Sequence, residues 1–149
     1  GKKDNKLQDK VDELEDRVKR QMAEFENFRK RTDKEKTAMF ETGAKSVIEK
    51  ILPVVDNFER GLAGLSEEEK KQPFAEGMAM VYKQLMTELD KLEVKPIEAV
   101  GCEFDPKLHN AVMQVESDEY ESGIIAQELQ KGYTYRDTVV RHSMVAVVQ

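Results

Sequence analysis

The feature that most constrains the fold is an apolar seam in the first part of the chain. Between Leu7 and Met39 there is neither proline nor glycine, and apolar residues recur at steps of three and four. They are Leu7, Val11, Leu14, Val18, Met22, Phe25 and Phe28. This spacing is typical of a coiled coil. A helix of about 40 residues would be about 60 Å long. Nothing else in the chain could cover so long a stripe, so we expect the helix to pair with a second copy.

The composition supports elongated helices rather than a compact monomer. Of the 149 residues, 39% are hydrophobic and 36% are charged, with a formal net charge of -6. Such a chain is either disordered or built of helices that bury a narrow stripe against a partner, and the seam favours helices. After Phe28 the seam degrades, because Thr32 and then Glu35 or Lys36 take its positions. We expect the coil to be only marginally stable there.

A second apolar pattern follows Thr42-Gly43. Ser46 and Glu49 have the spacing of a capping box, so either a new helix begins here or the first one bends. Both alternatives stay open at this point. Pro53 should kink the helix locally, and Gly61, Gly64 and Ser66 indicate a turn. The apolar residues of this segment are Val47, Ile48, Ile51, Leu52, Val55, Phe58 and Leu62.

A further helix is predicted from about Pro73 to Leu92. Proline is favourable in a first helical turn, and one face of this segment is apolar, with Phe74, Met78, Val81, Leu85, Leu89 and Leu92. Two such helices joined by a short loop make half of a four-helix bundle, which a second chain would complete. The residues predicted to form this bundle interface are Ile51, Leu52, Val55, Phe58, Met78, Val81, Leu85 and Leu89.

Beyond Lys95-Pro96 the pattern changes to short runs of strand-forming residues. Residues 111–115, 123–126 and 138–148 are rich in Val, Ile, Ala and Met and are separated by turn residues. They predict a small, mostly antiparallel β-domain. The predicted fold class is therefore α+β, with a dimerising coiled coil over 1–42, a bundle helix pair over 43–93 and a β-domain over 94–149.

The inventory of catalytic residues is thin. The chain has two histidines, one cysteine, no tryptophan and no glycine-rich phosphate loop. We expect His109 to be a structural side chain that hydrogen-bonds a turn, and Cys102 to be a small, partly buried apolar residue. A cleft that brought both of them and a carboxylate within hydrogen-bond reach would favour an enzyme instead. We predict no catalytic activity, no cofactor, no metal and no small-molecule substrate.

The basic run Arg29-Lys30-Arg31, followed by Lys34 and Lys36, allows three interpretations. It could be solvated helix surface, a docking patch for an acidic protein, or a nucleic-acid stripe. The negative net charge disfavours nucleic acid. No apolar stretch is long enough to cross a membrane, and a single cysteine favours a reducing compartment.

Four motifs in the chain resemble those of the GrpE family. Residues 26–32 (ENFRKRT) are similar to its end-of-coil motif, and residues 51–60 (ILPVVDNFER) to its bundle-entry motif. Residues 104–111 (FDPKLHNA) match its β-domain signature, and residues 130–133 with 141–147 match its closing strands. The resemblance covers nearly the whole chain, and four motifs in order are far more specific than one coiled coil.

The resemblance implies an adenine nucleotide exchange factor, a co-chaperone that stabilises the open state of the ATPase domain of a DnaK-type heat-shock chaperone and accelerates ADP release. It implies a parallel homodimer and a thermosensing role for the long helices. The docking residues it implies are Arg29, Arg31, Phe104, Pro106, Leu129 and Val147. Gly77 matches a family glycine, for which close packing within the bundle is our first interpretation.

One departure concerns the turn at Tyr135-Arg136-Asp137-Thr138, where many family members carry Asn-Gly or Asp-Gly; it leaves the hairpin register open. The alternative function is a dimeric coiled-coil scaffold or adaptor without exchange activity. The short form without a presequence favours a bacterial cytoplasm over a mitochondrial matrix.

Overall fold

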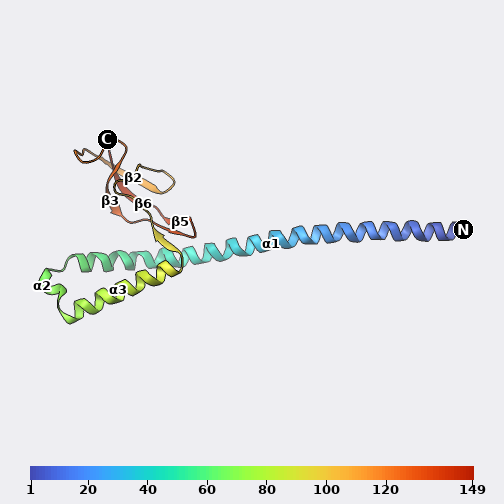
Figure 1. The fold of residues 1–149 in the computed structure, drawn as a ribbon, viewed down its shortest axis with the longest axis horizontal. Coiled ribbons are helices and arrows are strands. Elements are labelled where there is room, and N and C mark those ends of the chain that lie inside the picture. The colour runs from blue at the N-terminus through green and yellow to red at the C-terminus, as the bar shows by residue number, and fades with distance from the viewer. The chain divides into compact units, whose positions relative to one another are not determined.

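The computed structural model describes residues 1–149 (Figure 1). The chain divides into two compact units, Gly1–Ala44 and Lys45–Gln149. The elements in chain order are α1 (Lys2–Ala63), α2 (Glu67–Lys70), α3 (Pro73–Lys91), β1 (Val94–Pro96), β2 (His109–Val115), β3 (Ile125–Gln130), β4 (Tyr133–Tyr135), β5 (Thr138–Arg141) and β6 (Ser143–Val148). Helices followed by strands confirm the predicted α+β class.

The first unit consists only of the first part of α1, up to Ala44, and is helical as the apolar seam predicts. All seven seam residues lie on this helix with 45% to 65% of each side chain exposed. A helix of this kind has no neighbour in its own unit on which to bury its stripe. In proteins most of the stability of a helix comes from packing its apolar face against other elements rather than from intrinsic helix propensity.

The helix does not end at Thr42-Gly43, which decides the question that the sequence leaves open. The Thr42 hydroxyl donates to the carbonyl oxygen of Ala38 at 2.9 Å, so its polar group is satisfied within the helix. Gly43 costs the helix about 1 kcal/mol relative to alanine but removes no hydrogen bond. Ser46 lies inside α1 and caps nothing, and the helix also continues through Pro53.

The second unit contains a helix pair, formed by α1 from Lys45 onward together with α3. Figure 1 shows α3 beside this part of α1, and the rings of Phe58 and Tyr82 stack with centroids 6.3 Å apart. Between the two helices, Ser66 and Glu69 form a complete capping box that starts α2. The buried apolar side chains of the pair are Ile48, Leu52, Val55, Ala75 and Leu89.

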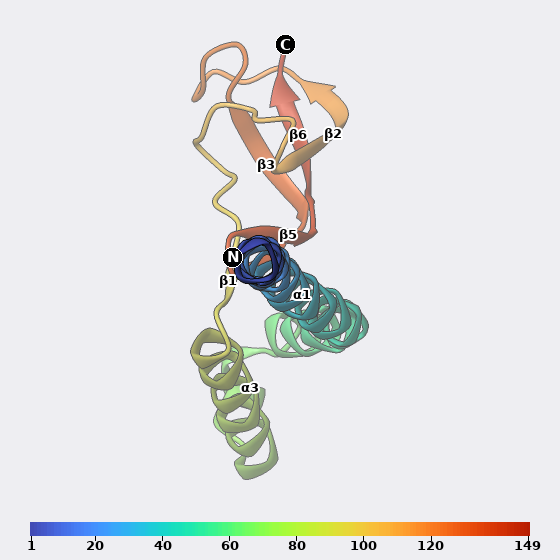
Figure 2. The same cartoon turned by 90° about the vertical axis from the view of Figure 1, so that its right-hand side faces the viewer.

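The strand region, residues 94–149, forms two three-stranded sheets. One has the order β1-β4-β5 and is antiparallel throughout. In the other, β6 lies between β2 and β3, as Figure 2 shows. Here β6 runs antiparallel to β3 but parallel to β2. The predicted domain is thus mostly antiparallel with one parallel pairing.

The core of the strand region lies on the β2-β6-β3 sheet. Ala99, Ile125 and Val145 are buried there, and Phe104 and Val147 pack against them. The strand predicted as one run over 138–148 is two strands, β5 and β6, separated at His142. Strand β6 is buried along most of its length, which is why its sequence is a nearly continuous apolar run rather than an alternating one.

The β4–β5 hairpin has a two-residue turn, which fixes the register left open by the sequence. Tyr135 pairs with Thr138, and Arg136 and Asp137 both have positive φ, at 47° and 64°. This combination is typical of the type I′ turn that suits the twist of a hairpin. Glu93 stabilises it from outside, because its carboxylate lies 2.9 Å from the Arg136 Nε.

Candidate functional site

The region most similar to a catalytic centre surrounds His109 and Cys102. Both line a hollow of about 340 Å³ together with Asp105 and Glu103. However, His109 is only 3% exposed, and its two ring nitrogens are occupied by the backbone. Nδ1 accepts from the Asp105 N–H at 3.0 Å, so Nε2 carries the proton and donates to the Glu98 carbonyl oxygen at 2.8 Å. Neither nitrogen is free to activate the Cys102 thiol.

These contacts confirm the structural role predicted for His109, and Cys102 is partly buried as expected. Nδ1 closes the turn that begins at Asp105, whose carboxylate also accepts from the Lys107 N–H at 2.9 Å. No group of three or more His, Cys, Asp or Glu side chains is arranged to hold a metal ion. None of the helices is long and apolar enough to span a bilayer.

The basic residues of α1 predicted to dock a partner lie on the helix surface. Arg29 and Arg31 are both exposed, and the Arg31 guanidinium lies 5.7 Å from the centre of the Phe28 ring. The end of the apolar seam and the start of the basic run therefore adjoin one another. A partner reaching Arg31 would meet apolar and cationic surface together.

The predicted docking residues of the strand region fall into two groups. Phe104 and Val147 pack against the core cluster and stay only partly exposed. Pro106 and Leu129 are exposed, Leu129 by 45% on β3. Phe104 and Val147 thus help to hold the sheet together as well as presenting part of their surface, whereas Pro106 and Leu129 are not part of this core cluster.

The residues predicted for the bundle interface also divide by exposure. Leu52, Val55 and Leu89 are buried within their own chain, with 0%, 0% and 3% exposed, so they have almost no surface left to offer a second chain. Ile51, Phe58, Met78 and Leu85 are half-buried, and Val81 is 46% exposed. An open apolar groove of about 470 Å³ runs between α1 and α3, lined by Val54, Phe58, Leu62, Leu65, Phe74 and Met78.

Gly77 lies on α3, where a Cβ atom would meet nothing within 4 Å. Close packing within this chain therefore does not explain the glycine. Any neighbour that requires its small size would have to belong to another molecule.

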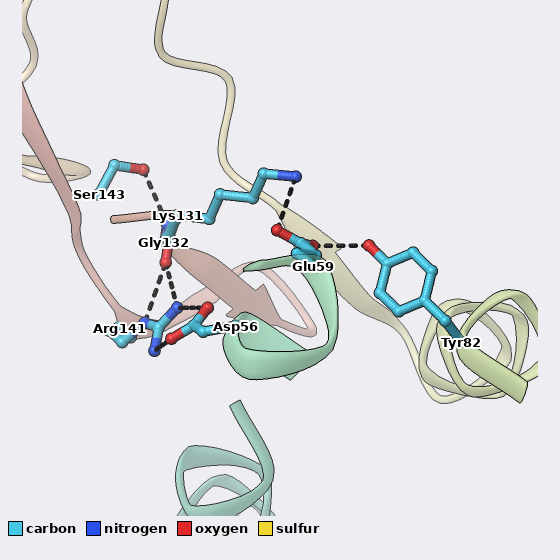
Figure 3. A network of polar contacts seen from close by, with 7 residues as sticks. All are labelled: Asp56, Glu59, Tyr82, Lys131, Gly132, Arg141 and Ser143. Carbon is cyan, nitrogen blue, oxygen red and sulfur yellow. Dashed lines mark hydrogen bonds and ion pairs between the residues drawn. The ribbon is translucent and has the colours of Figure 1, made fainter. Parts of the chain in front are cut away.

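Sequence reasoning missed a group of polar residues that joins α1 to the strand region (Figure 3). The Arg141 guanidinium donates to both carboxylate oxygens of Asp56, at 2.7 and 2.9 Å, and to the Lys131 carbonyl oxygen through Nε and Nη2. The Lys131 ammonium lies 3.2 Å from Glu59, which accepts from the Tyr82 hydroxyl at 2.6 Å. We call these five residues, Asp56, Glu59, Tyr82, Lys131 and Arg141, the polar clamp.

The pKa values of two tyrosines are raised here, those of Tyr82 in the polar clamp and of Tyr133 beside it. Burial raises the pKa of Tyr82, and the hydrogen bond to Glu59 raises it further. Burial also raises the pKa of Tyr133 to about 12, with added contributions from the carboxylates of Glu59 and Asp56. Arg141 lies over the Tyr133 ring at 5.7 Å and opposes that effect.

Beside the polar clamp, the backbone at Gly132 closely approaches the backbone of residues 141–143. The Gly132 N–H donates to the Ser143 hydroxyl at 3.0 Å (Figure 3). A Cβ atom at Gly132 would lie 2.3 Å from the Ser143 nitrogen and 2.6 Å from the Arg141 oxygen. Only glycine fits where the start of β4 crosses the junction of β5 and β6.

Comparison with known proteins gives a consistent result. The sequence model of the GrpE family matches residues 2–149. The chain is 66% identical over 137 residues to Protein GrpE of Lachnoclostridium phytofermentans, covering 92% of this chain and 61% of that protein. It is 48% identical to Protein GrpE of Parageobacillus thermoglucosidasius, covering 96% of this chain and 64% of that protein. It is 47% identical to Protein GrpE of Bacillus velezensis, covering 97% of this chain and 76% of that protein. The chain thus spans about three fifths of the first two relatives.

Proposed function

The chain belongs to the GrpE family, and on that premise we propose that it is an adenine nucleotide exchange factor, a co-chaperone of a DnaK-type chaperone. The observation that carries the proposal is the family match over residues 2–149, which includes the long helix, the helix pair and the strand region together. We further propose that it works in a bacterial cytoplasm, since the relatives named above are bacterial proteins.

An exchange factor needs no reacting group. It needs a surface that fits the open, nucleotide-free ATPase domain better than the closed, ADP-bound one. Because coupling is reciprocal, the factor by which ADP weakens this contact is the factor by which the contact weakens ADP binding. About a hundredfold effect corresponds to about 2.7 kcal/mol. A few apolar contacts and charge-assisted hydrogen bonds can supply that difference.

We assign the chaperone contact to two surfaces of this chain. The exposed guanidinium groups of Arg29 and Arg31 would pair with acidic side chains of the partner. In the strand region, the exposed side chains of Pro106 and Leu129 and the accessible edges of Phe104 and Val147 would provide the apolar contact.

The dimer is the second part of the proposal. Seven seam residues at 45% to 65% exposure on one helix, and an open apolar groove on the helix pair, are both surfaces that a second copy would cover. In this proposal residues 1–42 pair as a coiled coil, residues 43–93 complete a four-helix bundle and residues 94–149 dock on the chaperone. The coil residues are Leu7, Val11, Leu14, Val18, Met22, Phe25 and Phe28.

We also propose a thermosensing role, which the same arrangement supports. The helix of residues 1–44 has no partner within its unit, and its seam weakens after Phe28. We expect it to melt at a lower temperature than the rest of the chain and to lower the exchange rate as it does so. Circular dichroism that showed one high-temperature transition, with no earlier loss of helix, would contradict this role.

The experiment that tests exchange is stopped-flow release of a fluorescent ADP analogue from a DnaK-type chaperone, with and without this protein. We expect strong acceleration, which an Arg29→Ala/Arg31→Ala variant loses. The matched control is Arg17→Ala/Arg20→Ala, which removes the same charge from exposed positions of the same helix.

The outcomes separate the two candidate functions. A loss with the first variant but not with the control would place the contact at Arg29 and Arg31. If a folded, dimeric sample gave no acceleration, the exchange function would be wrong and the scaffold or adaptor would remain. Affinity for the nucleotide-free chaperone without any change in ADP release would also favour the scaffold.

A further inference from the structure

We propose that Asp56 and Arg141 are positioning residues that lock the strand region to the helix pair, so that the docked strand region resists closure of the chaperone. The inference rests on the proposed exchange function. It starts from the polar clamp, in which residues of α1 meet residues 72 to 85 positions later in the chain (Figure 3).

The covalent link between the helix pair and the strand region is short. α3 ends at Lys91 and β1 begins at Val94, so Leu92 and Glu93 make the whole connection. In a connection of only two residues, small changes in the dihedral angles swing everything beyond it. The nearby pairs Glu93–Arg136 and Asp90–Lys95 are exposed and hold it weakly. Fixing the orientation requires a second attachment away from this connection.

The polar clamp supplies this second attachment, and it does so on the other helix. Asp56 and Glu59 project from α1, whereas Lys131 and Arg141 belong to the strand region. Tyr82 of α3 donates to Glu59, so both helices are tied to the same group of charges. The helix pair and the strand region are therefore held at two separate places.

The geometry of Arg141 makes this attachment directional. Nη1 and Nη2 each donate to one oxygen of Asp56, while Nε and Nη2 donate to the Lys131 carbonyl oxygen. The guanidinium plane is thereby fixed by a side chain on one side and by backbone on the other. Lysine carries the same charge but cannot form this planar fork.

Burial distinguishes the Asp56–Arg141 pair from the exposed Glu93–Arg136 pair. The Arg141 and Asp56 side chains are 16% and 20% exposed, whereas Glu93 and Arg136, at the same type of contact, are 62% and 41% exposed. An exposed pair exchanges readily with water and is weakly coupled to structure. A half-buried bidentate pair allows little sliding, so it specifies an orientation more than it adds stability.

An exchange factor needs such rigidity for a mechanical reason. If the strand region swung freely about Leu92 and Glu93, it could stay bound while the chaperone closed around ADP. It would then bind both states of the chaperone equally. A ligand with equal affinity for two states does not shift the equilibrium between them. Fixing the strand region to the helix pair converts binding into a preference for the open state.

The first measurement uses the protein alone. Spin labels at exposed positions of α3 and β3, Lys83→Cys and Gln127→Cys in a Cys102→Ser background, report the distance between the helix pair and the strand region. We expect Asp56→Asn and the milder Arg141→Lys to broaden the distance distribution. Glu88→Gln, which breaks the exposed Lys91–Glu88 ion pair within α3, should leave it narrow.

The second measurement is ADP release by variants of the 149-residue chain across a range of concentrations. We expect the maximal release rate to fall about tenfold, while the concentration for half-maximal effect changes less than about threefold. In a variant that merely unfolds, the maximal release rate would fall and the concentration for half-maximal effect would rise. Circular dichroism and the thermal midpoint check folding, and Arg141→Lys provides a second test if Asp56→Asn is unstable.

Each outcome bears on the inference in a distinct way. Unchanged distance distributions in both clamp variants would overturn it, whatever the kinetics. Broadened distributions with an unchanged maximal rate would also overturn it. If the wild-type protein itself gave no acceleration, the proposed function would fail, and the distance measurement would still show whether the clamp fixes the strand region.

Discussion

Gly132→Ala provides a sharp test of how the strand region is packed. Gly132 immediately precedes β4, where it is buried against the backbone of residues 141–143. An added methyl group would lie 2.3 Å from the Ser143 nitrogen and 2.6 Å from both the Arg141 oxygen and the His142 carbonyl carbon. Ordinary van der Waals contact begins at 3.4 Å. All three neighbours are backbone atoms, so no side chain can rotate away.

The cost can be worked out from what must move. To admit the methyl group, residues 132 and 141–143 have to separate by roughly 1 Å, which is overpacking at about 1–3 kcal/mol. Separation also weakens the Gly132 N–H bond to the Ser143 hydroxyl and the Ser143 N–H bond to the Leu108 carbonyl. Each net hydrogen bond contributes about 1 kcal/mol. We expect the free energy of unfolding to fall by about 3–5 kcal/mol.

Tyrosine fluorescence during urea unfolding measures this change. All four tyrosines, Tyr82, Tyr120, Tyr133 and Tyr135, belong to the second unit, so the signal reports on that unit alone. Wild type and variant must be compared at one protein concentration, because self-association adds to apparent stability.

Gly77→Ala is the matched control for Gly132→Ala. A Cβ atom there meets nothing within 4 Å, and alanine is the better helix former, so the variant should gain about 0.5–1 kcal/mol. A loss of less than about 1 kcal/mol for Gly132→Ala would refute the packing argument. A loss for Gly77→Ala would instead indicate a close neighbour from a second chain.

Three further predictions concern other parts of the chain. Asp137→Gly should raise the free energy of unfolding by about 0.5–1 kcal/mol in urea titrations, because Asp137 holds φ at 64° in a turn that suits glycine; a decrease would contradict the turn assignment. Because the folded pKa of Tyr133 is raised from 10.0 to about 12, the folded state holds its proton more tightly than the unfolded state. The contribution of Tyr133 to the free energy of unfolding is complete below pH 10, and about 2–3 kcal/mol of it is lost as the pH rises through 12. Urea titrations at each pH measure this loss, and Tyr133→Phe should make the free energy of unfolding less dependent on pH. Leu14→Asp should shift sedimentation from dimer toward monomer, since Leu14 lies in the exposed seam, and an unchanged mass would contradict the coil.

The helices could be predicted because their signals are local. Steps of three and four define α1 between Leu7 and Phe28, and the proline at position 73 marks the start of α3. The continuity of α1 through Gly43 could not be decided, since a penalty of about 1 kcal/mol neither ends a helix nor guarantees one. The short helix α2 was not predicted, because Ser66 was interpreted only as part of a turn, although residues 66–69 carry a capping-box pattern.

The strands could be located more readily than they could be paired. Short apolar runs indicate β2, β3 and β6, but which strands are neighbours depends on contacts far apart in the sequence. The parallel pairing of His109 with Ser143 has no local signature. The turn at Arg136-Asp137 is similarly ambiguous, because neither residue type requires positive φ, and their conformation is set by the register of β4 and β5.

The polar clamp shows why candidate sites are the hardest part to predict. Asp56 follows Leu52 by four residues, and Glu59 follows Val55 by four, so both carboxylates lie on the face that α1 buries. A charge on a buried face indicates that a partner exists. The sequence does not say that the partner is Arg141, 85 residues later, since charge patterns give no long-range pairing.

The chain distributes its apolar and charged residues in an unusual way, and this distribution separates two tasks. Seam residues such as Leu7 and Met22 are 65% and 64% exposed, while Asp56 and Arg141 are only 20% and 16% exposed. A helix with exposed apolar surface is stabilised by covering that surface with another molecule. Its stability therefore depends on concentration and temperature. The geometry of a half-buried bidentate ion pair is fixed by contacts within its own chain. The stability of the first unit would thus have to come from another molecule, whereas the second unit holds this ion pair by itself.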